Sequence, residues 1–415
     1  MSIINILLTK LLRFRSFRIF LVNVYPVLKK FKIIFLFQKL NNGSFSDPWD
    51  HFEINKKGIL KTHDLENFSA TEALVKYTID AENLIVLDRS YNFGILSGSV
   101  FDLNDIEQAC KALNVKYTVY DIKDPALFEK ITNSDCDGIF ISPSFANVID
   151  RNVFHELTQI LSSETSLKIY PTVRELNIYE SKRTLAAFLS VNKIPHPSTS
   201  VFYDFEKAKV FLDTCRYPVV FKTHIGASSS GVEILRNKKQ AVKMAEQLFF
   251  KYYLRKMETE KRSIEWGYML LQEYIDDVKE YRVIKAGDSW FGYQKWKEQH
   301  QIFLSGSGKQ KMINPSFGLL DFCYGVAEKF HFTTMCFDIF ENKKGEFLVN
   351  ELQTWFGSYD PTEMYVNNIP GRYRMIEGEW TFEPGFYNVY GTNLLRIAHF
   401  ISLLQDCSSK QFSKL

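Results

Sequence analysis

Short apolar runs of strand length alternate with helix-spaced stretches in the first part of the chain, and this alternation constrains the fold more than any other feature. The apolar runs lie at Leu84–Leu87, Lys116–Tyr120 and Gly138–Ser142. Helical spacing separates them, at Leu103–Leu113 and Pro125–Ile131. Strands that alternate with helices build a parallel sheet with both faces covered. We therefore predict an α/β domain in this part of the chain.

The later part of the sequence favours antiparallel strands. Val219–Phe221 and Val232–Leu235 are apolar runs joined by a loop of small residues, which predicts a hairpin. Thr334–Phe340 and Phe347–Thr354 form a second pair, joined by a turn rich in Asn, Lys and Gly. The chain of 415 residues exceeds the limit of about 250–300 residues for a single core. We therefore expect two or three cores.

The overall composition is that of a folded soluble protein, with 46% hydrophobic and 24% charged residues. The net charge of +3 is too small to indicate a nucleic-acid partner, and we predict none. The six cysteines include no C-x-x-C pair, which argues against a zinc site or a disulfide framework and favours a reducing compartment. A cytoplasmic location is therefore expected.

The N-terminal segment is basic and contains no acidic residue from Ser2 to Ser46. Short apolar runs are interleaved with its lysines and arginines, but no unbroken run approaches the ~20 residues that span a bilayer. It also lacks the cleavage site of a secretory signal. Two interpretations remain: residues 1–40 are a basic amphipathic arm in peripheral contact with the cytoplasmic membrane face, or they are helices docked on the protein with solvated basic faces.

The loop of the first hairpin has the composition of a phosphate-binding segment. Lys222 ends the first apolar run, and Gly226 to Gly231 follow it almost without side chains. A lysine is rarely buried without a partner, and a loop of small residues lets its backbone amides approach an anion. The lysine precedes the loop and a strand follows it, so neither the Walker A pattern nor the dinucleotide fingerprint fits. We predict a flap that closes over phosphates.

Other motifs flank this loop in a fixed order. Lys182 in "ESKRTL" precedes it, and "LLQEYIDDVKEYRV", "CFDIF" and "VNELQT" follow it. This order resembles the ATP-grasp superfamily, which includes D-alanine–D-alanine ligase, glutathione synthetase and the ligases that add glutamate to a ribosomal protein. The resemblance covers roughly residues 80–405 and implies four parts: a basic arm and connector (1–80), a pre-grasp α/β domain (81–180) and two ATP-grasp subdomains (181–275 and 276–405).

The resemblance implies a nucleotide site that uses cations for the phosphates and carboxylates for the nucleoside. Lys182 and Lys222 would approach the α- and β-phosphates, while Glu280 would hold the ribose hydroxyls. Glu273 and the backbone of two residues after it would recognise the adenine edge. The remaining implied contacts are the flap residues Ser228, Ser229, Ser230 and Gly231 and the adenine-side residues Tyr274 and Ile275.

The resemblance also implies a metal and catalytic set. Asp338 and Glu351 would bind Mg²⁺, with two ions expected and Mn²⁺ as the alternative. Pairing of Asp338 near Glu351 in the second hairpin would place both carboxylates on one face. Family members usually have Asn two residues after the metal Glu, whereas this chain has Gln353 as the third expected ligand. Arg282 would stabilise the transferring phosphoryl group, and Lys295 would contact phosphate or stack on a neighbouring tryptophan.

The implied activity is that of an ATP- and Mg²⁺-dependent carboxylate–amine ligase that works through an acyl phosphate. Its substrates would be ATP with two further molecules, drawn from cell-envelope or saccharide precursors or peptides. The alternatives are a kinase of the same fold and a nucleotide-binding regulatory protein without turnover. Dimers are common in the resembled family. Trp355 and Phe356 would suit stacking on a sugar or core packing, and we expect His196 and His224 to be satisfied loop histidines.

Overall fold

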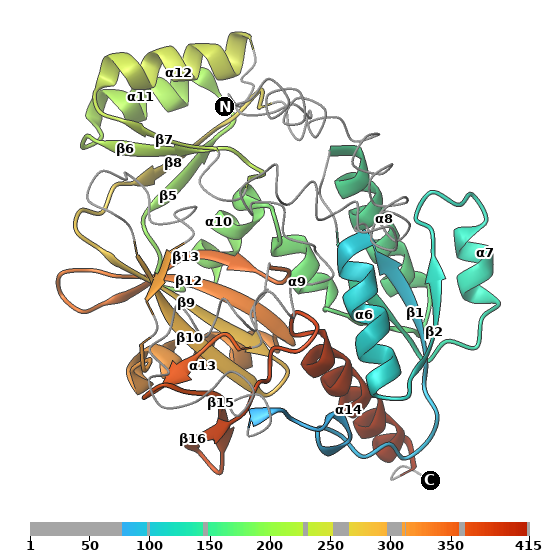
Figure 1. Ribbon diagram of the computed structural model, residues 1–415. Coiled ribbons are helices and arrows are strands. Elements are labelled where there is room, and N and C mark those ends of the chain that lie inside the picture. Colours follow the sequence, from blue (N-terminus) through green and yellow to red (C-terminus); the bar gives the residue numbers. More distant parts are fainter. Residues whose placement is uncertain are drawn as a thin grey trace, which may run out of the picture. The chain divides into compact units, whose positions relative to one another are not determined.

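The computed structural model describes residues 77–97, 100–143, 148–226, 231–251, 265–296, 309–311, 313–356 and 362–412 (Figure 1). All of them belong to one compact unit, residues 67–415. Three sheets follow one another along the chain, one parallel and two antiparallel, which confirms the predicted α/β class. The predicted basic arm, residues 1–40, lies outside the described residues. Within the described part of the chain, no helix is both long and apolar enough to cross a membrane.

The parallel sheet has the strand order β2-β1-β3-β4. Helices connect the strands, as predicted, and α6 contacts both β1 and β2. The strands are β1 (Asn92–Ser97), β2 (Lys116–Tyr120), β3 (Gly138–Ser142) and β4 (Lys168–Tyr170), and the connecting helices are α6 (Val100–Ala112), α7 (Leu127–Thr132) and α8 (Val148–Glu164).

The strand predicted at Leu84–Leu87 is wrong. This run follows the short 3-10 helix η1 (Ala81–Asn83) as a connection, and the first strand begins only at Asn92. Leu84, Ile85 and Leu87 are partly buried and pack against the core of the parallel sheet, whereas Val86 is 85% exposed. Apolar residues can thus cover a core from outside without joining the sheet, and an apolar run alone does not distinguish the two arrangements.

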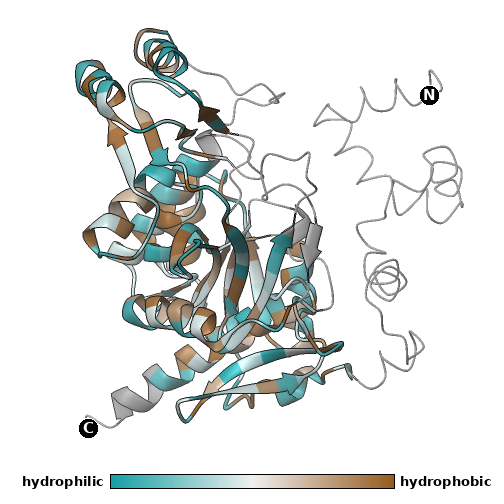
Figure 2. Ribbon diagram, turned by 90° about the vertical axis from the view of Figure 1, so that its left-hand side faces the viewer, coloured by the Kyte–Doolittle hydropathy of each residue, from teal (hydrophilic) through white to brown (hydrophobic). Residues whose placement is uncertain are grey.

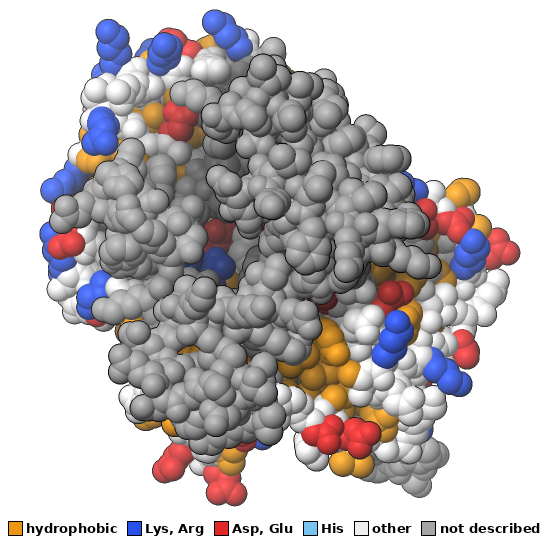
Figure 3. All heavy atoms as spheres, in the orientation of Figure 1, with side chains coloured by type: hydrophobic (Ala, Val, Ile, Leu, Met, Phe, Trp, Pro, Cys, Tyr) orange, Lys and Arg blue, Asp and Glu red, His pale blue; other side chains and the backbone are white. Residues whose placement is uncertain are grey.

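The first antiparallel sheet has the order β5-β8-β6-β7. The predicted hairpin is confirmed, with Lys222 opposite Val232 at the end where the connecting loop begins. Helices α11 and α12 lie against each other and share a hydrophobic core with this sheet (Figure 1), while exposed lysines and arginines gather over them in Figure 3. The elements are β5 (Thr199–Phe202), α11 (Phe205–Thr214), β6 (Val219–Lys222), β7 (Val232–Leu235), α12 (Lys238–Phe250) and β8 (Met269–Glu273).

The second antiparallel sheet has the order β13-β12-β9-β10-β15-β14, with β11 paired to β10 and β16 to β15. Helices α10 and α13 contribute hydrophobic side chains to its core. In Figure 2 the helices of the described part of the chain carry both hydrophobic and hydrophilic residues, as expected for helices with one buried face. The elements are α10 (Lys182–Val191), β9 (Lys279–Ala286), β10 (Ser289–Trp296), β11 (Lys309–Lys311), α13 (Phe317–Phe330), β12 (Thr334–Glu341), β13 (Phe347–Gln353), β14 (Tyr365–Val366), β15 (Ile369–Ile376) and β16 (Glu379–Pro384).

A buried carboxylate ties the segment after the parallel sheet to the second antiparallel sheet. Glu175 of α9 (Val173–Ile178) is fully buried and accepts hydrogen bonds from the backbone N–H groups of Thr172, Thr333 and Thr334 at 2.7, 2.7 and 2.8 Å. Three charge-assisted bonds satisfy a carboxylate that burial would otherwise penalise. The start of β12 and the approach to α10 are therefore held together.

The C-terminal helix α14 (Asn393–Phe412) packs on the parallel sheet. Leu394, Ile397 and Phe400 share a core with Phe93 of β1, and α14 contacts α6. The predicted boundary, which groups residues 276–405 in one subdomain, assigns most of this helix to the other sheet. The chain thus returns to its first sheet at its end, a long-range contact that local patterns do not reveal.

Candidate functional site

Seven of the charged residues predicted for the site lie on the paired strands β9, β10, β12 and β13 or contact β13. They come from both antiparallel sheets and from the first turn of α10. Four are cationic and three are carboxylates, so the cluster carries one excess positive charge: Lys182, Lys222, Arg282 and Lys295 with Glu280, Asp338 and Glu351.

Asp338 is the centre of the cluster. It lies on β12 with 1% of its surface exposed, directly opposite Arg282 of β9. Arg282 donates to both carboxylate oxygens, from Nε at 2.8 Å and from Nη2 at 2.9 Å, and Lys295 Nζ lies 2.6 Å from Oδ2. Burial alone would raise the pKa of Asp338, but the two cations outweigh it and hold the pKa well below its usual range. Asp338 is therefore ionised at neutral pH.

Lys295 links two carboxylates inside the sheet. It lies opposite Glu280 in the pairing of β10 with β9, and its ammonium is 2.6 Å from Glu280 Oε1 as well as close to Asp338. Burial would lower the pKa of Lys295, yet the attraction of Asp338 and Glu280 raises it. Lys295 therefore pairs with two carboxylates in the sheet, and its contact with phosphate stays a prediction. Glu280 is 3% exposed, so this ion pair with Lys295 is buried.

Lys182 and Glu351 connect α10 to β13. Their charged groups are 3.0 Å apart, and Lys182 also donates to the backbone oxygen of Gly226 at the start of the flap. Glu351 lies directly opposite Asp338 in the β12–β13 hairpin, the pairing that the sequence suggested. Burial would raise the pKa of Glu351, but Lys182 outweighs it and keeps the pKa below its usual value. Both expected metal carboxylates are thus ionised; Glu351 contacts Lys182, and Asp338 contacts Arg282 and Lys295.

Asn350 is a site residue that the sequence did not indicate. A bulge follows Asp338 on the hairpin: Asp338 pairs with Glu351, whereas the next residue pairs with Val349. Asn350 is therefore the extra residue, and its Oδ1 accepts a hydrogen bond from Lys222 Nζ at 2.9 Å. Burial lowers the pKa of Lys222 to about 8, against the attraction of Glu351. A bulge changes the direction in which side chains point, and here it turns Asn350 toward Lys222. No local sequence pattern predicted this bulge.

Gln353, the predicted third metal ligand, presents its nitrogen to the carboxylate. Its Nε2 donates to Glu351 Oε1 at 2.8 Å, and its Oε1 accepts from the backbone N–H of Glu180 at 3.3 Å. The side chain of Glu180 in turn accepts from Gly226 N at 2.9 Å. Gln353 therefore connects the hairpin to the base of the flap, and in this arrangement its oxygen does not face the expected metal carboxylates.

The base of the flap requires a glycine at position 231. A Cβ on Gly231 would lie 1.8 Å from Thr223 Oγ1, far inside van der Waals contact. The backbone of these two residues is also joined, from Thr223 N to Gly231 O at 2.8 Å. The predicted flap residues Ser228, Ser229 and Ser230 lie outside the described residues.

The predicted adenine-side segment joins the two antiparallel sheets. Glu273 ends β8, and its Oε1 accepts a hydrogen bond from Ser198 N at 2.7 Å. Tyr274 is 41% exposed, Ile275 is partly buried, and both belong to the connection into β9. Their backbone groups are available at the junction of the sheets, and recognition of adenine by them stays a prediction.

The donor set fits Mg²⁺. Among the described residues, no group of three or more His, Cys, Asp or Glu side chains could hold a metal. Asp338 and Glu351 nevertheless form a pair of ionised carboxylates on adjacent strands. Mg²⁺ is typically bound by one or two carboxylates together with substrate phosphates and water. These two residues can therefore hold the ion once phosphates are present; the number of ions stays a prediction.

Other predicted residues have structural positions. Trp355 is 7% exposed in the core of the parallel sheet, and the guanidinium of Arg396 lies over both Trp355 and Phe356 at 4.2 and 4.7 Å from the ring centroids. Of the two roles considered for these aromatic residues, core packing fits this arrangement. The imidazole of His196 forms a local hydrogen bond, with Nδ1 2.6 Å from the backbone oxygen of Ile194, as expected for a satisfied loop histidine.

No family model matches this chain, and neither does any curated protein. Solved structures of ATP-grasp enzymes are similar to it in fold. The N5-carboxyaminoimidazole ribonucleotide synthetase of Thermotoga maritima is 18% identical, over 64% of this chain and 68% of that one, with a TM-score of 0.44. A RimK domain ATP-grasp protein of Sphaerobacter thermophilus is 15% identical, over 63% and 90%, with a TM-score of 0.46.

A third similar structure is the biotin carboxylase domain of the 2-oxoglutarate carboxylase of Hydrogenobacter thermophilus, with 16% identity over 74% of this chain and 69% of that one and a TM-score of 0.48. At such identities and TM-scores these structures carry no argument about reaction or substrate.

Proposed function

We propose that this chain is an ATP-grasp enzyme that uses ATP and Mg²⁺ to join a carboxylate to an amine. One observation carries the proposal: Asp338 and Glu351 lie opposite each other on one hairpin, and the same hairpin contacts both Lys182 and Lys222 from separate elements. Two lysines and two ionised carboxylates at one place are the groups that a magnesium triphosphate needs.

The charges of the cluster favour a polyanionic ligand. With four cations and three carboxylates, the described site has an excess positive charge before any ligand binds. Lys182 contacts a carboxylate oxygen and Lys222 an amide oxygen here, and an ammonium has three donors, so the phosphates of ATP would add more strongly charged partners. Gly226 and Gly231 at the flap base leave room for the backbone to approach the same phosphates.

The proposed reaction has two steps. A substrate oxygen of the carboxylate attacks the γ-phosphorus, the bond to the β-phosphate oxygen breaks, and ADP leaves with an acyl phosphate formed. The amine of the second substrate then attacks the acyl carbon, phosphate leaves, and the amine loses a proton to solvent. Mg²⁺ held by Asp338 and Glu351 would neutralise charge on the phosphate oxygens. Arg282, kept ionised beside Asp338, faces the same site and would stabilise the phosphoryl group in transfer.

No nucleophilic side chain is needed, because positioning and electrostatics supply the catalysis in such transfers. The test is acyl-phosphate trapping: the protein is incubated with ATP, Mg²⁺ and a panel of carboxylic acids, and hydroxylamine is added to convert an acyl phosphate to a hydroxamate. Hydroxamate formation that requires ATP and a particular acid supports the proposal. ADP release with a hydroxylamine-resistant phosphate ester would indicate a kinase instead, and nucleotide binding without ADP release would indicate a regulatory protein.

The substrate and the location belong to the same proposal. The enzyme would join the carboxylate and the amine in the cytoplasm, and the substrates would be cell-envelope or saccharide precursors or peptides. Residues 1–40 would contact the membrane face. Their basic, acid-free composition supports this location. Sedimentation with vesicles that contain anionic lipid is the test: the full chain should sediment with them and a chain lacking residues 1–40 should not. Equal sedimentation of both would remove the membrane contact from the proposal.

A further inference from the structure

A continuous path of hydrogen bonds joins the expected metal carboxylate Glu351 to Gly226 at the flap base. Gln353 Nε2 donates to Glu351 Oε1 at 2.8 Å, and Gln353 Oε1 accepts from the backbone N–H of Glu180 at 3.3 Å. The carboxylate of Glu180 then accepts from Gly226 N at 2.9 Å. Lys182 forms a second path between the same ends, since its Nζ contacts both Glu351 Oε1 and Gly226 O. The expected metal site and the flap base are therefore connected twice.

The two partners of Gln353 fix the orientation of its amide. A carboxylate oxygen can only accept a hydrogen bond when it is ionised, and a backbone N–H can only donate one. The amide nitrogen must therefore face Glu351, and the amide oxygen must face the backbone of Glu180. The reversed amide would lose both bonds. An amide binds a cation through its oxygen, and here that oxygen already has a partner on the side of Glu180.

The contacts of Glu351 with Gln353 and Lys182 both involve one carboxylate oxygen, Oε1. An ion can therefore be bound through Oε2 without loss of either contact. Gln353 lies two residues after Glu351 on β13, so the two side chains are on the same face of the sheet. Hydrogen bonds from neighbouring groups orient metal-binding side chains, and their removal typically weakens metal binding by about 10- to 100-fold. Gln353 is thus placed to orient Glu351.

Glu180 has a backbone conformation that residues with a side chain rarely adopt. Its φ is 47°, in the left-handed region, where the Cβ is disfavoured. The residue lies between the end of α9 and the start of α10, and 8% of its surface is exposed. In this conformation its N–H meets Gln353 while its carboxylate meets Gly226. Backbone strain of this kind is found preferentially at functional sites.

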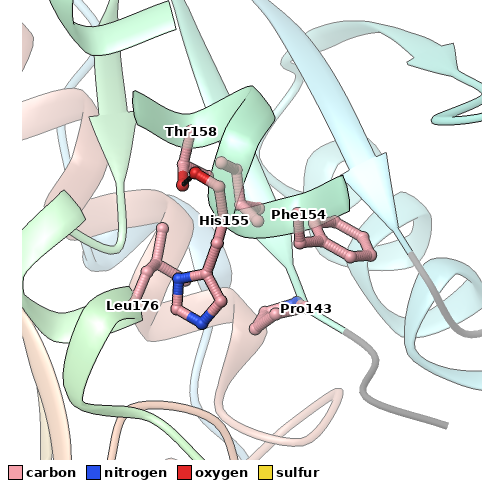
Figure 4. Close-up of a pocket in the computed structure, with 6 residues that line it drawn as sticks. Pro143, Phe154, His155, Thr158 and Leu176 are labelled. Atoms are coloured by element: carbon pink, nitrogen blue, oxygen red, sulfur yellow. Dashed lines mark hydrogen bonds between the residues drawn. The ribbon is translucent and has the colours of Figure 1, made fainter. Parts of the chain in front are cut away.

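Close packing of the preceding helix α9 holds Glu180 in place. Glu175 ties α9 to the start of β12, and Leu176 shares a core with α8. Figure 4 shows Leu176 beside His155 and Pro143, around a cavity of about 10 Å³, which has room for one water molecule at most. Side chains packed this closely leave α9 little freedom to shift. The hydrogen-bonded path therefore runs between positions that the fold keeps fixed.

We infer that Gln353 and Glu180 are positioning residues that couple the metal site to the flap base. Gln353 orients Glu351 for the ion, and Glu180 holds Gly226 where the nucleotide phosphates would lie. This inference rests on the proposed function and gives Gln353 a role other than that of an ion ligand. An ion at Glu351 and a phosphate beside Gly226 then stabilise the same arrangement, so each strengthens the binding of the other. Part of that strengthening passes through Gln353 and Glu180.

The first test compares the affinity for ADP with and without Mg²⁺, measured by titration calorimetry. Gln353→Met keeps the length of the side chain but removes its donor and acceptor. The affinity with Mg²⁺ should fall by about tenfold or more, whereas the affinity without Mg²⁺ should change by less than about twofold. Gln294→Met is the matched control, because Gln294 is on β10 of the same sheet with its side chain on the opposite face from Lys295. A similar fall in both conditions, or none, would overturn the inference.

A double-mutant cycle separates coupling from ligation of the ion. Glu180→Ala removes the acceptor of Gly226 N and should weaken binding of Mg²⁺-ADP by about tenfold, whereas Glu180→Gln, which keeps an acceptor oxygen, should retain part of the affinity. Because both substitutions break the same path, Gln353→Met combined with Glu180→Ala should bind no more than about threefold more weakly than either alone. Losses that multiply, to about a hundredfold, are expected of an ion ligand that acts separately and contradict the coupling.

A readout without nucleotide distinguishes this inference from the proposed function. In protein labelled at its glycine nitrogens, hydrogen exchange at the Gly226 amide is followed by NMR. Exchange should be faster in Glu180→Ala and in Gln353→Met than in the native protein or Gln294→Met, because the partner of this amide is lost or loosened. Unchanged exchange in both variants would refute the inference whatever the titrations show. If the native protein bound no ADP, the proposed function would fail instead, and exchange at Gly226 would still decide whether the path from Gln353 operates.

Discussion

Lys222 Nζ donates a hydrogen bond to Asn350 Oδ1 at 2.9 Å, and this bond joins the two antiparallel sheets at the candidate site. Lys222 ends β6 of the first sheet, and Asn350 is the bulge residue of β13 in the second. The bulge therefore places the neutral Oδ1 of Asn350 beside the partly buried ammonium of Lys222. The next residue along β13 is Glu351, which carries one of the two expected metal carboxylates.

The first prediction concerns this bond. Asn350→Leu should weaken binding of Mg²⁺-ADP by about fivefold to thirtyfold, since loss of a hydrogen bond to a charged group costs about 1–2 kcal/mol. Titration calorimetry measures the effect, and Asn350→Asp, which keeps the oxygen, should retain tighter binding than Asn350→Leu. Lys343→Ala, at the exposed turn of the same hairpin, is the control. Native affinity in Asn350→Leu would show that Lys222 does not depend on this partner.

The second prediction concerns pH. In the free protein the pKa of Lys222 is lowered to about 8, so above pH 8 a growing share of the ammonium is neutral. Phosphates bind the charged form, and binding must then be accompanied by proton uptake. The affinity for ADP should therefore be constant below pH 8 and fall by up to about tenfold per pH unit from 8 toward 10.5.

Calorimetry in buffers of different ionisation enthalpy would detect the uptake at pH 9. Lys222→Arg provides the control, because arginine stays charged throughout this range and should abolish the dependence. A fall in affinity of the same size in Lys222→Arg would assign the titration to another group.

The third prediction compares two carboxylates of one strand. Asp338→Asn leaves Arg282 and Lys295 buried without their shared carboxylate and should destabilise the protein by about 3–5 kcal/mol. Glu341→Gln removes the charge of a partly buried carboxylate on the same strand whose cationic partner, Lys279, is exposed; the amide oxygen can still accept from the Tyr281 hydroxyl, so the change should cost under about 1 kcal/mol. Urea unfolding at pH 7 measures both. Similar losses for the two variants would contradict the buried network.

The fourth prediction concerns the flap base. Gly231→Ala places a Cβ 1.8 Å from Thr223 Oγ1, so the backbone must shift, at a cost of about 1–3 kcal/mol in stability. Nucleotide affinity should fall as well, because residue 231 closes the proposed flap. Thr223→Ala combined with Gly231→Ala removes the closest atom and should restore part of both losses. Equal defects in the single and double variants would show that this contact is not the cause.

The sequence by itself determined the features that depend on local patterns. Alternating strands and helices indicated the parallel sheet, and turn residues between apolar runs indicated both hairpins. The second hairpin also allowed Asp338 to lie near Glu351, and the structure pairs these two residues. The lysine at the end of an apolar strand, Lys222, already indicated a candidate anion-binding site.

Only the tertiary structure decided which distant residues complete the site. The bulge at Asn350 arises from strand pairing that hydrophobic periodicity does not predict, and the ion pair of Lys182 with Glu351 depends on how α10 packs against β13. The same reason explains why the run at Leu84–Leu87 covers a core without forming a strand, and why α14 returns to the first sheet. Hydrophobic periodicity determines which face of an element is buried, whereas the partner of that face is chosen by packing across the whole chain.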